Sequence, residues 1–311
     1  MATDITADAT RAAVAAAEVV SARPRLTPGR LAALATVGFA ICFYGIPLLW
    51  LFLAGTRSGA SLVEDAPLAI GNWSSFRDTW INLTTYNDFQ MAQWALNSLI
   101  YAVGGVALAL VSAIPAGYAL ALEHFPGRRL ILILTLIAMI TPSTATVLPI
   151  FLQLSLLGLN NTYLGFILAS GFFPFGVYLS YIYFSSSLPR GVMDSARIDG
   201  CNRWQIFSKI ALPLAGPLVA LVAFFSFLAV WSNYFLAMVL LSSTDLFNLP
   251  VGLTAMVGGS GALSNLPAGN IPIKKPEVIL AAILVALPVL LIFLVAQGKV
   301  RSGLLSGAEK G

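Results

Sequence analysis

The feature that most constrains this chain is the length of its uncharged stretches. Residues 130–189 contain no Asp, Glu, Lys or Arg, and residues 210–273 contain one charged residue, Asp245. Over the whole chain 58% of the residues are apolar and 10% are charged, whereas an ordinary soluble domain has about 25% charged residues. A water-exposed surface cannot be built from such stretches, so we expect lipid to be the solvent for most of the chain.

Six apolar stretches are long enough to cross a bilayer, which takes about 20 residues in helical form. These stretches lie at roughly 31–55, 96–122, 130–152, 163–184, 214–241 and 278–298. We therefore predict an all-α membrane protein with six transmembrane helices in residues 31–298, between an N-terminal tail (1–30) and a C-terminal tail (299–311). The first stretch is too long for the apolar core of a signal peptide, so we interpret it as a retained helix.

The distribution of Lys and Arg predicts the orientation of the chain. Four lie in the N-terminal tail, two at 128–129, four between 190 and 209 and three in the C-terminal tail, which leaves four on the opposite side. Because cytoplasmic loops are enriched in Lys and Arg, we expect both termini in the cytoplasm and no nucleic-acid partner. Segments 56–95 and 242–277 are then outer loops, and we interpret Trp94 in the first as an anchor at the membrane interface.

The chemistry of the predicted spans argues against several function classes. They contain no ionisable carboxylate, amine or guanidinium, which argues against a proton-coupled carrier and weakens the case for a sodium-coupled carrier that could use backbone carbonyls. The single histidine, His124, rules out an H-E-x-x-H zinc site, and no phosphate-binding loop is present. We predict that the chain is not an enzyme and binds no cofactor, so that any ATP is used by another subunit.

Residues 190–213 form a charged segment between two apolar stretches. Gly200 allows a turn, Asn202 can cap a second short helix, and Pro213 is expected to close that helix where the fifth span begins. Ile206, Phe207 and Ile210 share one face of this helix. The pattern predicts a helix-turn-helix on the cytoplasmic surface, which serves either as a docking element or as an amphipathic connector at the lipid surface.

The same segment resembles the EAA loop, the signature of permease subunits of ATP-binding-cassette (ABC) importers. Asp194-Ser195-Ala196, Gly200, Ile210 and Leu212-Pro213 occur at the spacing of that loop. Asp replaces the usual Glu at 194 and Ser replaces Ala at 195, which keeps a carboxylate and a small residue. The string at 196–201 is similar to the carbohydrate branch of the family, which includes the smaller permease of the maltose transporter. Further similar fragments include 70–73, 97–99, 125–128, 157–163, 231–235, 249–253 and 303–311.

The resemblance implies a type I importer in the plasma (inner) membrane of a bacterium or archaeon. Its partners would be a second six-helix permease, a dimeric ABC ATPase that binds ATP and Mg, and an extracytoplasmic sugar-binding protein. The outer loop 242–277 would reach into the binding protein, and Asp194 would pair with a basic residue of the ATPase. The resemblance assigns ATPase coupling to Asp194, Ser195, Ala196, Arg197, Asp199, Gly200, Ile210, Leu212 and Pro213.

The cargo and its path are less closely specified. A sugar is the expected cargo, with glycerol-3-phosphate, a polyol or an amino sugar as alternatives within the same family, and an ion-coupled secondary carrier as the alternative outside it. The polar tract at 141–146 could line a water-filled path, although its hydroxyls could equally bond to their own helix. The residues that we propose for the path are Asn97, Thr141, Ser143, Trp231, Asn233 and Tyr234.

Overall fold

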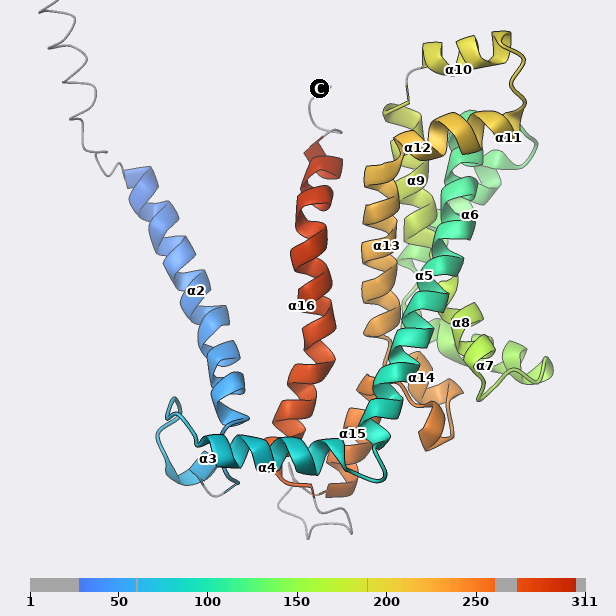
Figure 1. Cartoon of the computed structure of the whole chain (residues 1–311). Coiled ribbons are helices and arrows are strands. Elements are labelled where there is room, and N and C mark those ends of the chain that lie inside the picture. Colours follow the sequence, from blue (N-terminus) through green and yellow to red (C-terminus); the bar gives the residue numbers. More distant parts are fainter. Residues whose placement is uncertain (1–27, 60, 189, 261–272, 306–311) are drawn as a thin grey trace, which may run out of the picture. The chain divides into compact units, whose positions relative to one another are not determined.

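The computed structural model describes residues 28–59, 61–188, 190–260 and 273–305 (Figure 1). All regular elements in these ranges are helices. The chain divides into two compact units, residues 1–53 and 54–311. The described part of the first unit belongs to helix α2 (Pro28–Ala54), whose large apolar side chains are mostly exposed, as suits a helix surrounded by lipid.

Three described helices are each long and apolar enough to cross a membrane: α2, α5 (Gln90–Leu122) and the Lys275–Gly298 part of α16 (Lys275–Leu305). Three further helix pairs reach the required length only together, and each pair is bent at a short break. The described residues therefore contain three to six candidate spans. The α16 helix continues to Leu305, beyond the end predicted for the last span at residue 298, and residues 1–27 and 306–311 of the predicted tails lie outside the described ranges.

The stretch at 130–152, predicted to be one transmembrane helix, consists of two helices. Helix α6 (Arg128–Ile140) ends at the break, α7 (Ser143–Leu156) begins after it, and their axes differ by 110°. Pro142 explains the break, because a residue before proline is pushed out of the α region, and Thr141 has φ −63° and ψ 124°. With 13 residues, α6 is about 20 Å long by itself, which is shorter than a hydrocarbon core of about 30 Å.

Two other predicted spans are also interrupted. The stretch at 163–184 consists of α8 (Tyr163–Gly171) and α9 (Pro174–Ser186), bent by 41° where Pro174 starts the second helix. The stretch at 214–241 is shorter than expected, because α13 (Gly216–Trp231) ends before a three-residue break and a separate short helix, α14 (Phe235–Leu240). Proline and capping residues break helices that apolar composition alone would continue.

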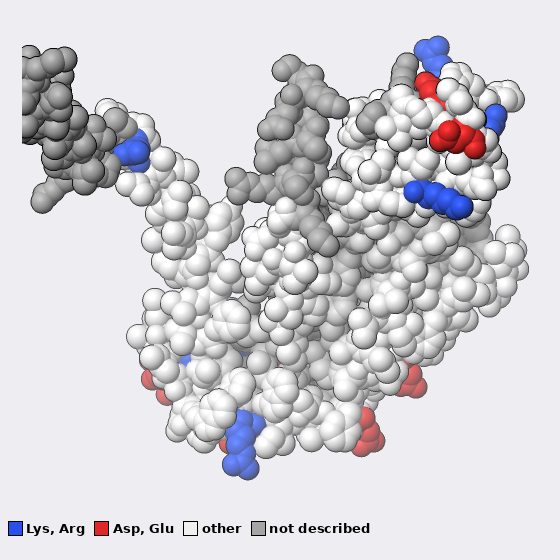
Figure 2. Space-filling view, turned by 45° about the horizontal axis from the view of Figure 1, so that its top comes forward, with Lys and Arg blue, Asp and Glu red and all other residues white. Residues whose placement is uncertain are grey.

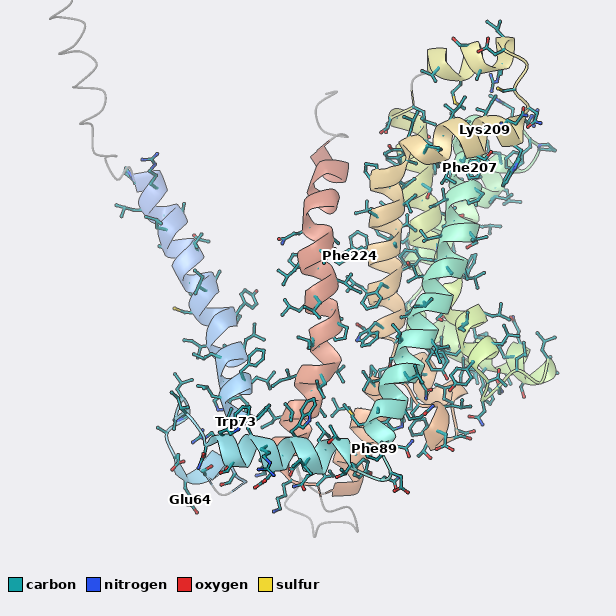
Figure 3. The ribbon with its side chains drawn as sticks, viewed as in Figure 1. Glu64, Trp73, Phe89, Phe207, Lys209 and Phe224 are labelled. Carbon is teal, nitrogen blue, oxygen red and sulfur yellow. The ribbon has the colours of Figure 1, made fainter. Side chains whose placement is uncertain are left out.

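Helix α5 lies at the centre of the second unit. It packs along α8, α9 and α13, and α13 in turn packs against α16 (Figure 1). Phe224, which α13 directs toward α16, has its ring 6.2 Å from that of Phe293 (Figure 3). Where α5 and α9 cross, a Cβ added at Gly117 would lie 2.2 Å from the Cβ of Ser180, so the two backbones are in close contact.

The predicted outer loops contain short helices. The first loop holds α3 (Ser61–Glu64) and α4 (Trp73–Thr84) and ends early, because α5 already begins at Gln90. Arg57 is 1% exposed and donates to the carbonyls of Ser61, Ala66 and Pro67, which ties this loop together. The second loop holds the 3-10 turn η2 (Thr244–Leu246) and α15 (Leu249–Ser260), and its residues 261–272 lie outside the described ranges.

Charged side chains of the second unit gather at its two ends. In Figure 2 they lie over α10 (Arg190–Ile198) and the helix that follows it at one end, and around the α3–α4 loop at the other, with an uncharged band between them. Such a band matches the part of a membrane protein that faces hydrocarbon. The charged segment 190–213 therefore lies at one edge of the uncharged band.

Candidate functional site

The segment 190–213 folds as the predicted helix-turn-helix. Helix α10 ends in a left-handed residue, Gly200, with φ +81°. The N–H of Gly200 donates to the carbonyl of Arg197 at 3.1 Å and the N–H of Cys201 donates to that of Ala196 at 3.0 Å. This pair of hydrogen bonds is the Schellman motif, in which a residue with positive φ ends a helix. The prediction of a turn at Gly200 is confirmed.

The second helix of the segment begins as predicted at a capping residue. The side chain of Asn202 accepts from the N–H of Gln205 at 2.8 Å, and the side chain of Gln205 accepts from the N–H of Asn202 at 2.9 Å. This reciprocal capping box starts α11 (Arg203–Ile206). The cap gives the backbone N–H groups of Asn202 and Gln205 hydrogen-bond partners within the chain. It thereby holds the two short helices in a defined relation.

The end of the second helix departs from a regular α-helix. The helix widens into a π turn, η1 (Phe207–Ala211), continues as α12 (Leu212–Leu214) and so ends one residue after Pro213, close to the predicted end, before the chain bends by 78° into α13. Proline cannot donate a hydrogen bond, and its ring crowds the carbonyl four residues earlier in a regular helix. A wider turn before Pro213 suits both properties, and such turns recur at functional sites.

One face of the segment is buried against the helix bundle. Met193 and Ala196 of α10 join Ile206 and Phe207 in a buried cluster with residues of α5 and α9. The ring of Phe207 lies 5.0 Å from that of Tyr118 on α5, which is itself 5.4 Å from the ring of Phe184 on α9. The apolar face predicted for the second helix is confirmed, and it is fixed to the ends of two candidate spans.

The opposite face of the segment is exposed and carries both charges and large apolar groups. Asp194 and Arg197 form an ion pair at 3.2 Å on the surface, and Asp199 is exposed beside them. Ile198 is 86% exposed and Trp204 is 69% exposed. Single exposed apolar residues are ordinary, but an isoleucine and a tryptophan next to a charged pair on a capped, rigid element have the composition of a protein interface.

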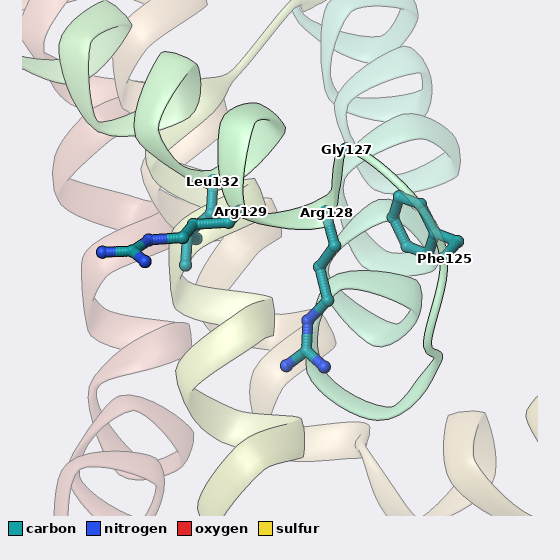
Figure 4. Close-up of a pocket in the computed structure, with 5 residues that line it drawn as sticks. All are labelled: Phe125, Gly127, Arg128, Arg129 and Leu132. Atoms are coloured by element: carbon teal, nitrogen blue, oxygen red, sulfur yellow. The ribbon is translucent and has the colours of Figure 1, made fainter.

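A second polar feature next to this segment is the turn between α5 and α6. It encloses an open hollow of about 450 Å³ lined by Phe125, Gly127, Arg128, Arg129 and Leu132 (Figure 4). Arg128 donates back to the carbonyls of Ala121 and Glu123, and the Glu123 side chain pairs with Arg203 of α11 at 3.1 Å. The turn is thereby tied to the helix-turn-helix. Figure 3 shows Lys209 next to Phe207 at this same end of the bundle.

The nine residues predicted for coupling divide between the two faces of the segment. Ala196 is buried, Ile210 and Leu212 are partly buried, and Gly200 forms the turn. The hydroxyl of Ser195 bonds back to the carbonyl of Gly191. The remaining residues are exposed: Asp194, Arg197, Asp199 and Pro213.

The six residues predicted for a cargo path do not form one group. Thr141 and Ser143 are exposed at the α6–α7 break, and the hydroxyl of Thr141 bonds back to the carbonyl of Ile137. Trp231 is buried and donates to the carbonyl of Val285 on α16 at 2.9 Å. In the break after α13, Asn233 accepts from the N–H of Leu236 and lies next to the half-buried Tyr234.

The sixth residue, Asn97, is fully buried and uses its whole hydrogen-bonding capacity. Its amide nitrogen donates to the carbonyls of Asp245 at 2.7 Å and Phe247 at 2.9 Å, and its oxygen accepts from Gln93 at 3.0 Å and from the hydroxyl of Tyr163 at 2.7 Å. A side chain amide has two donor hydrogens and one oxygen that accepts two bonds, so none is left over. Asn97 joins α5, α8, η2 and the residue that follows η2.

Other residues of α5 near Asn97 bond to the same backbone segment, a role that the sequence analysis missed. Trp94, expected to be an interface anchor, is instead 2% exposed and donates its indole N–H to the carbonyl of Thr244 at 2.8 Å. Gln90 and Tyr101 also donate to carbonyls of residues 244–246. Polar groups at 90, 94, 97, 98 and 101 share one helical face, and this spacing could have revealed the row.

Comparisons with known proteins bear on both the helix-turn-helix and the polar row of α5. Residues 113–304 match the family model of the binding-protein-dependent transport system inner membrane component. The chain is 34% identical over 291 residues to the arabinooligosaccharides transport system permease protein AraQ of Halalkalibacterium halodurans, covering 92% of this chain and 99% of that protein. It is 32% identical to the maltodextrin transport system permease protein MalD of Streptococcus pneumoniae, covering 81% of this chain and 92% of that protein.

A solved structure has the same fold. A chain from the crystal structure of a bacterial ABC transporter involved in the import of the acidic polysaccharide alginate superposes with a TM-score of 0.73 at 25% identity. The superposition covers 87% of this chain and 95% of that one. The bent helix pairs described above therefore belong to a fold that an ABC importer also uses.

Proposed function

The chain belongs to the binding-protein-dependent transport system inner membrane component family, and from that premise we propose that it is the permease subunit of an ABC importer for oligosaccharides or smaller sugars. The family match over residues 113–304 carries the proposal, because it includes both the helix-turn-helix and most of the bundle. The named cargoes of relatives, arabino-oligosaccharides and maltodextrins, support a carbohydrate. The chain is a membrane transport subunit and not the catalytic one.

The ATPase that drives transport docks on the exposed face of segment 190–213. That face presents Asp194, Ile198 and Trp204 on helices held by a Schellman turn and a capping box, so little conformational freedom is lost on binding. Asp194 exchanges its surface pair with Arg197 for a cation of the ATPase. ATP and Mg are bound by the dimeric ATPase and not by this chain.

The bundle crosses the membrane six times with both termini in the cytoplasm. The pairs α6–α7 and α8–α9 each count as one span, α13 is a span that begins after the cytoplasmic segment 190–213, and the excess of Lys and Arg at the 190–213 end supports the orientation. The α3–α4 loop and the segment between α14 and the start of α16 then face outward, toward a sugar-binding protein. A second six-helix permease completes the pathway, and the two permeases together supply the polar groups that contact the cargo.

The test is reconstitution of the whole transporter. The chain is coexpressed with a second permease and an ABC ATPase of its source organism, purified through a tag on this chain, and placed in liposomes with the binding protein. We expect copurification of all subunits, and ATP-dependent uptake of labelled arabino- or malto-oligosaccharide. An ATPase variant that binds but does not hydrolyse ATP is the control. Uptake by this chain alone under an ion gradient would show that it is a secondary carrier, and uptake of glycerol-3-phosphate, a polyol or an amino sugar in place of oligosaccharide would correct the cargo.

A further inference from the structure

Helix α5 holds the backbone of residues 244–249 with a row of side chains. Five hydrogen bonds run from Gln90, Trp94, Asn97 and Tyr101 to the carbonyls of residues 244–247, and the hydroxyl of Ser98 accepts from the N–H of Leu249 at 2.7 Å. Four of these five side chains are at most 2% exposed. Buried hydrogen bonds are expensive to leave unmade, so this segment must move together with α5.

A second attachment fixes the same stretch from the other side. Asn161, which has φ +57°, donates its backbone N–H to the carbonyl of Leu240 at 2.8 Å. Its side-chain oxygen accepts from the N–H groups of Ser242 and Ser243. Asn97 connects the two attachments, because it also accepts from Tyr163 at the start of α8. Residues 240–249 are thus bound to α5 and α8 as one body.

The far end of α5 is attached to the helix-turn-helix. The ring of Tyr118 contacts that of Phe207 at 5.0 Å, and Glu123 pairs with Arg203 at 3.1 Å. Between the two ends α5 is one helix of 33 residues, about 50 Å long. Pro115 lies within it, but the close backbone contact of Gly117 with Ser180 clamps this part of α5 to α9.

These contacts place one continuous helix between the outward loop and the ATPase face. We propose that α5 is a mechanical link that passes docking of the loaded binding protein to the ATPase, with Asn97 as the positioning residue at its outer end and Tyr118 at its inner end. The proposal rests on the proposed function. It assigns Asn97 to transmission of the docking signal, because all of the hydrogen-bonding groups of its amide are already bonded within the chain.

The experiment uses the purified complete transporter in liposomes and measures ATP hydrolysis with and without binding protein saturated with arabino- and malto-oligosaccharides. Asn97→Asp keeps the size of the side chain and the acceptor for Tyr163, but replaces the two donors to Asp245 and Phe247 with an oxygen. We expect basal hydrolysis within twofold of wild type and at least a fivefold loss of maximal stimulation. Tyr118→Leu, which keeps apolar bulk in the cluster but loses the ring contact with Phe207, should likewise keep basal hydrolysis and lose stimulation. The double variant should lose no more than the stronger single variant, because both substitutions break one path.

Two further variants make the result specific. Ser112→Ala is the matched control, since the hydroxyl of Ser112 bonds only within α5, to the carbonyls of Leu108 and Ala109, and its loss should leave stimulation unchanged. Tyr101→Phe removes one hydrogen bond, to the carbonyl of Leu246, with no change of shape. If Asn97→Asp does not assemble, Tyr101→Phe takes its place in the experiment. The expected result is then a roughly threefold loss of stimulation.

The opposite results would overturn the proposal. Full stimulation in Asn97→Asp and Tyr118→Leu, equal loss of basal and stimulated hydrolysis, or multiplying losses in the double variant would each show that α5 has only a local structural role. Failure of the proposed function looks different, because the wild-type complex would then show no uptake driven by ATP. The two failures are therefore separated by the wild-type measurement.

Discussion

Two glycines of α15 provide a sharp test of the packing around the α5 row. A Cβ added at Gly252 would lie 2.2, 2.3 and 2.8 Å from three ring atoms of Trp94, whereas a Cβ added at Gly258 meets nothing within 4 Å. Ordinary contacts between carbon atoms are about 3.5–4.0 Å. The ring of Trp94 cannot turn away without losing its hydrogen bond to Thr244, so α15 would have to move by more than about 1 Å.

The expected magnitude follows from two opposing terms. Alanine is a better helix former than glycine by about 1 kcal/mol, which favours both substitutions. Overpacking costs about 1–3 kcal/mol, and Gly252→Ala should fall near the upper end because Trp94 is buried and its indole N–H is bonded to the carbonyl of Thr244. Gly252→Ala is thus expected to destabilise the protein by about 2 kcal/mol, and Gly258→Ala to be neutral or stabilising by up to about 1 kcal/mol.

The assay is thermal unfolding of the purified transporter in detergent, read as the monodisperse fraction that remains after heating. A difference of about 2–3 kcal/mol between the variants corresponds to roughly 4–12 °C in the apparent midpoint for a unit of this size. Gly252→Ala should have the lower midpoint. If Gly252→Ala is as stable as Gly258→Ala, then α15 does not pack on Trp94 as described, and the argument that residues 244–249 are held rigidly on α5 loses its basis.

The remaining predictions concern the helix-turn-helix. Gly200→Val should cost about 2 kcal/mol or more and reduce ATPase retention on the permeases, since φ is +81° and a side chain there is strained, whereas Gly200→Asn should be better tolerated. Asp194→Ala should leave the melting midpoint unchanged, because its pair in this chain is exposed, but should lower ATPase retention, and Asp194→Glu should restore it. Trp204→Ala should weaken ATPase binding in a pull-down without lowering the midpoint, whereas Phe207→Ala, which opens a cavity in a buried cluster, should destabilise the permease by about 3–5 kcal/mol. Normal ATPase retention in Asp194→Ala and Trp204→Ala together would place the docking surface elsewhere.

Local sequence predicted the helix-turn-helix closely because the groups that decide it are neighbours in the chain. A glycine three residues after Arg197 and an asparagine three before Gln205 determine the turn and the cap through backbone hydrogen bonds that span only a few residues. The spans were predicted less well where composition and backbone chemistry disagree. An apolar stretch with Pro142 inside it satisfies any hydropathy rule, but the chain bends at Pro142 and runs on as one helix through Pro115, a difference that apolar composition does not reveal.

The sequence by itself determined that most of this chain lies in the membrane, that it is helical, and that a capped charged segment interrupts its apolar stretches. Only the tertiary structure decided what Asn97 and Trp94 do, because their partners are backbone carbonyls about 150 residues further along the chain. A polar side chain in an apolar helix must find a hydrogen-bond partner, and this much is local chemistry. Which partner it finds depends on the helices that pack beside it, and in this fold the packing brings residues 244–249 onto the same face of α5.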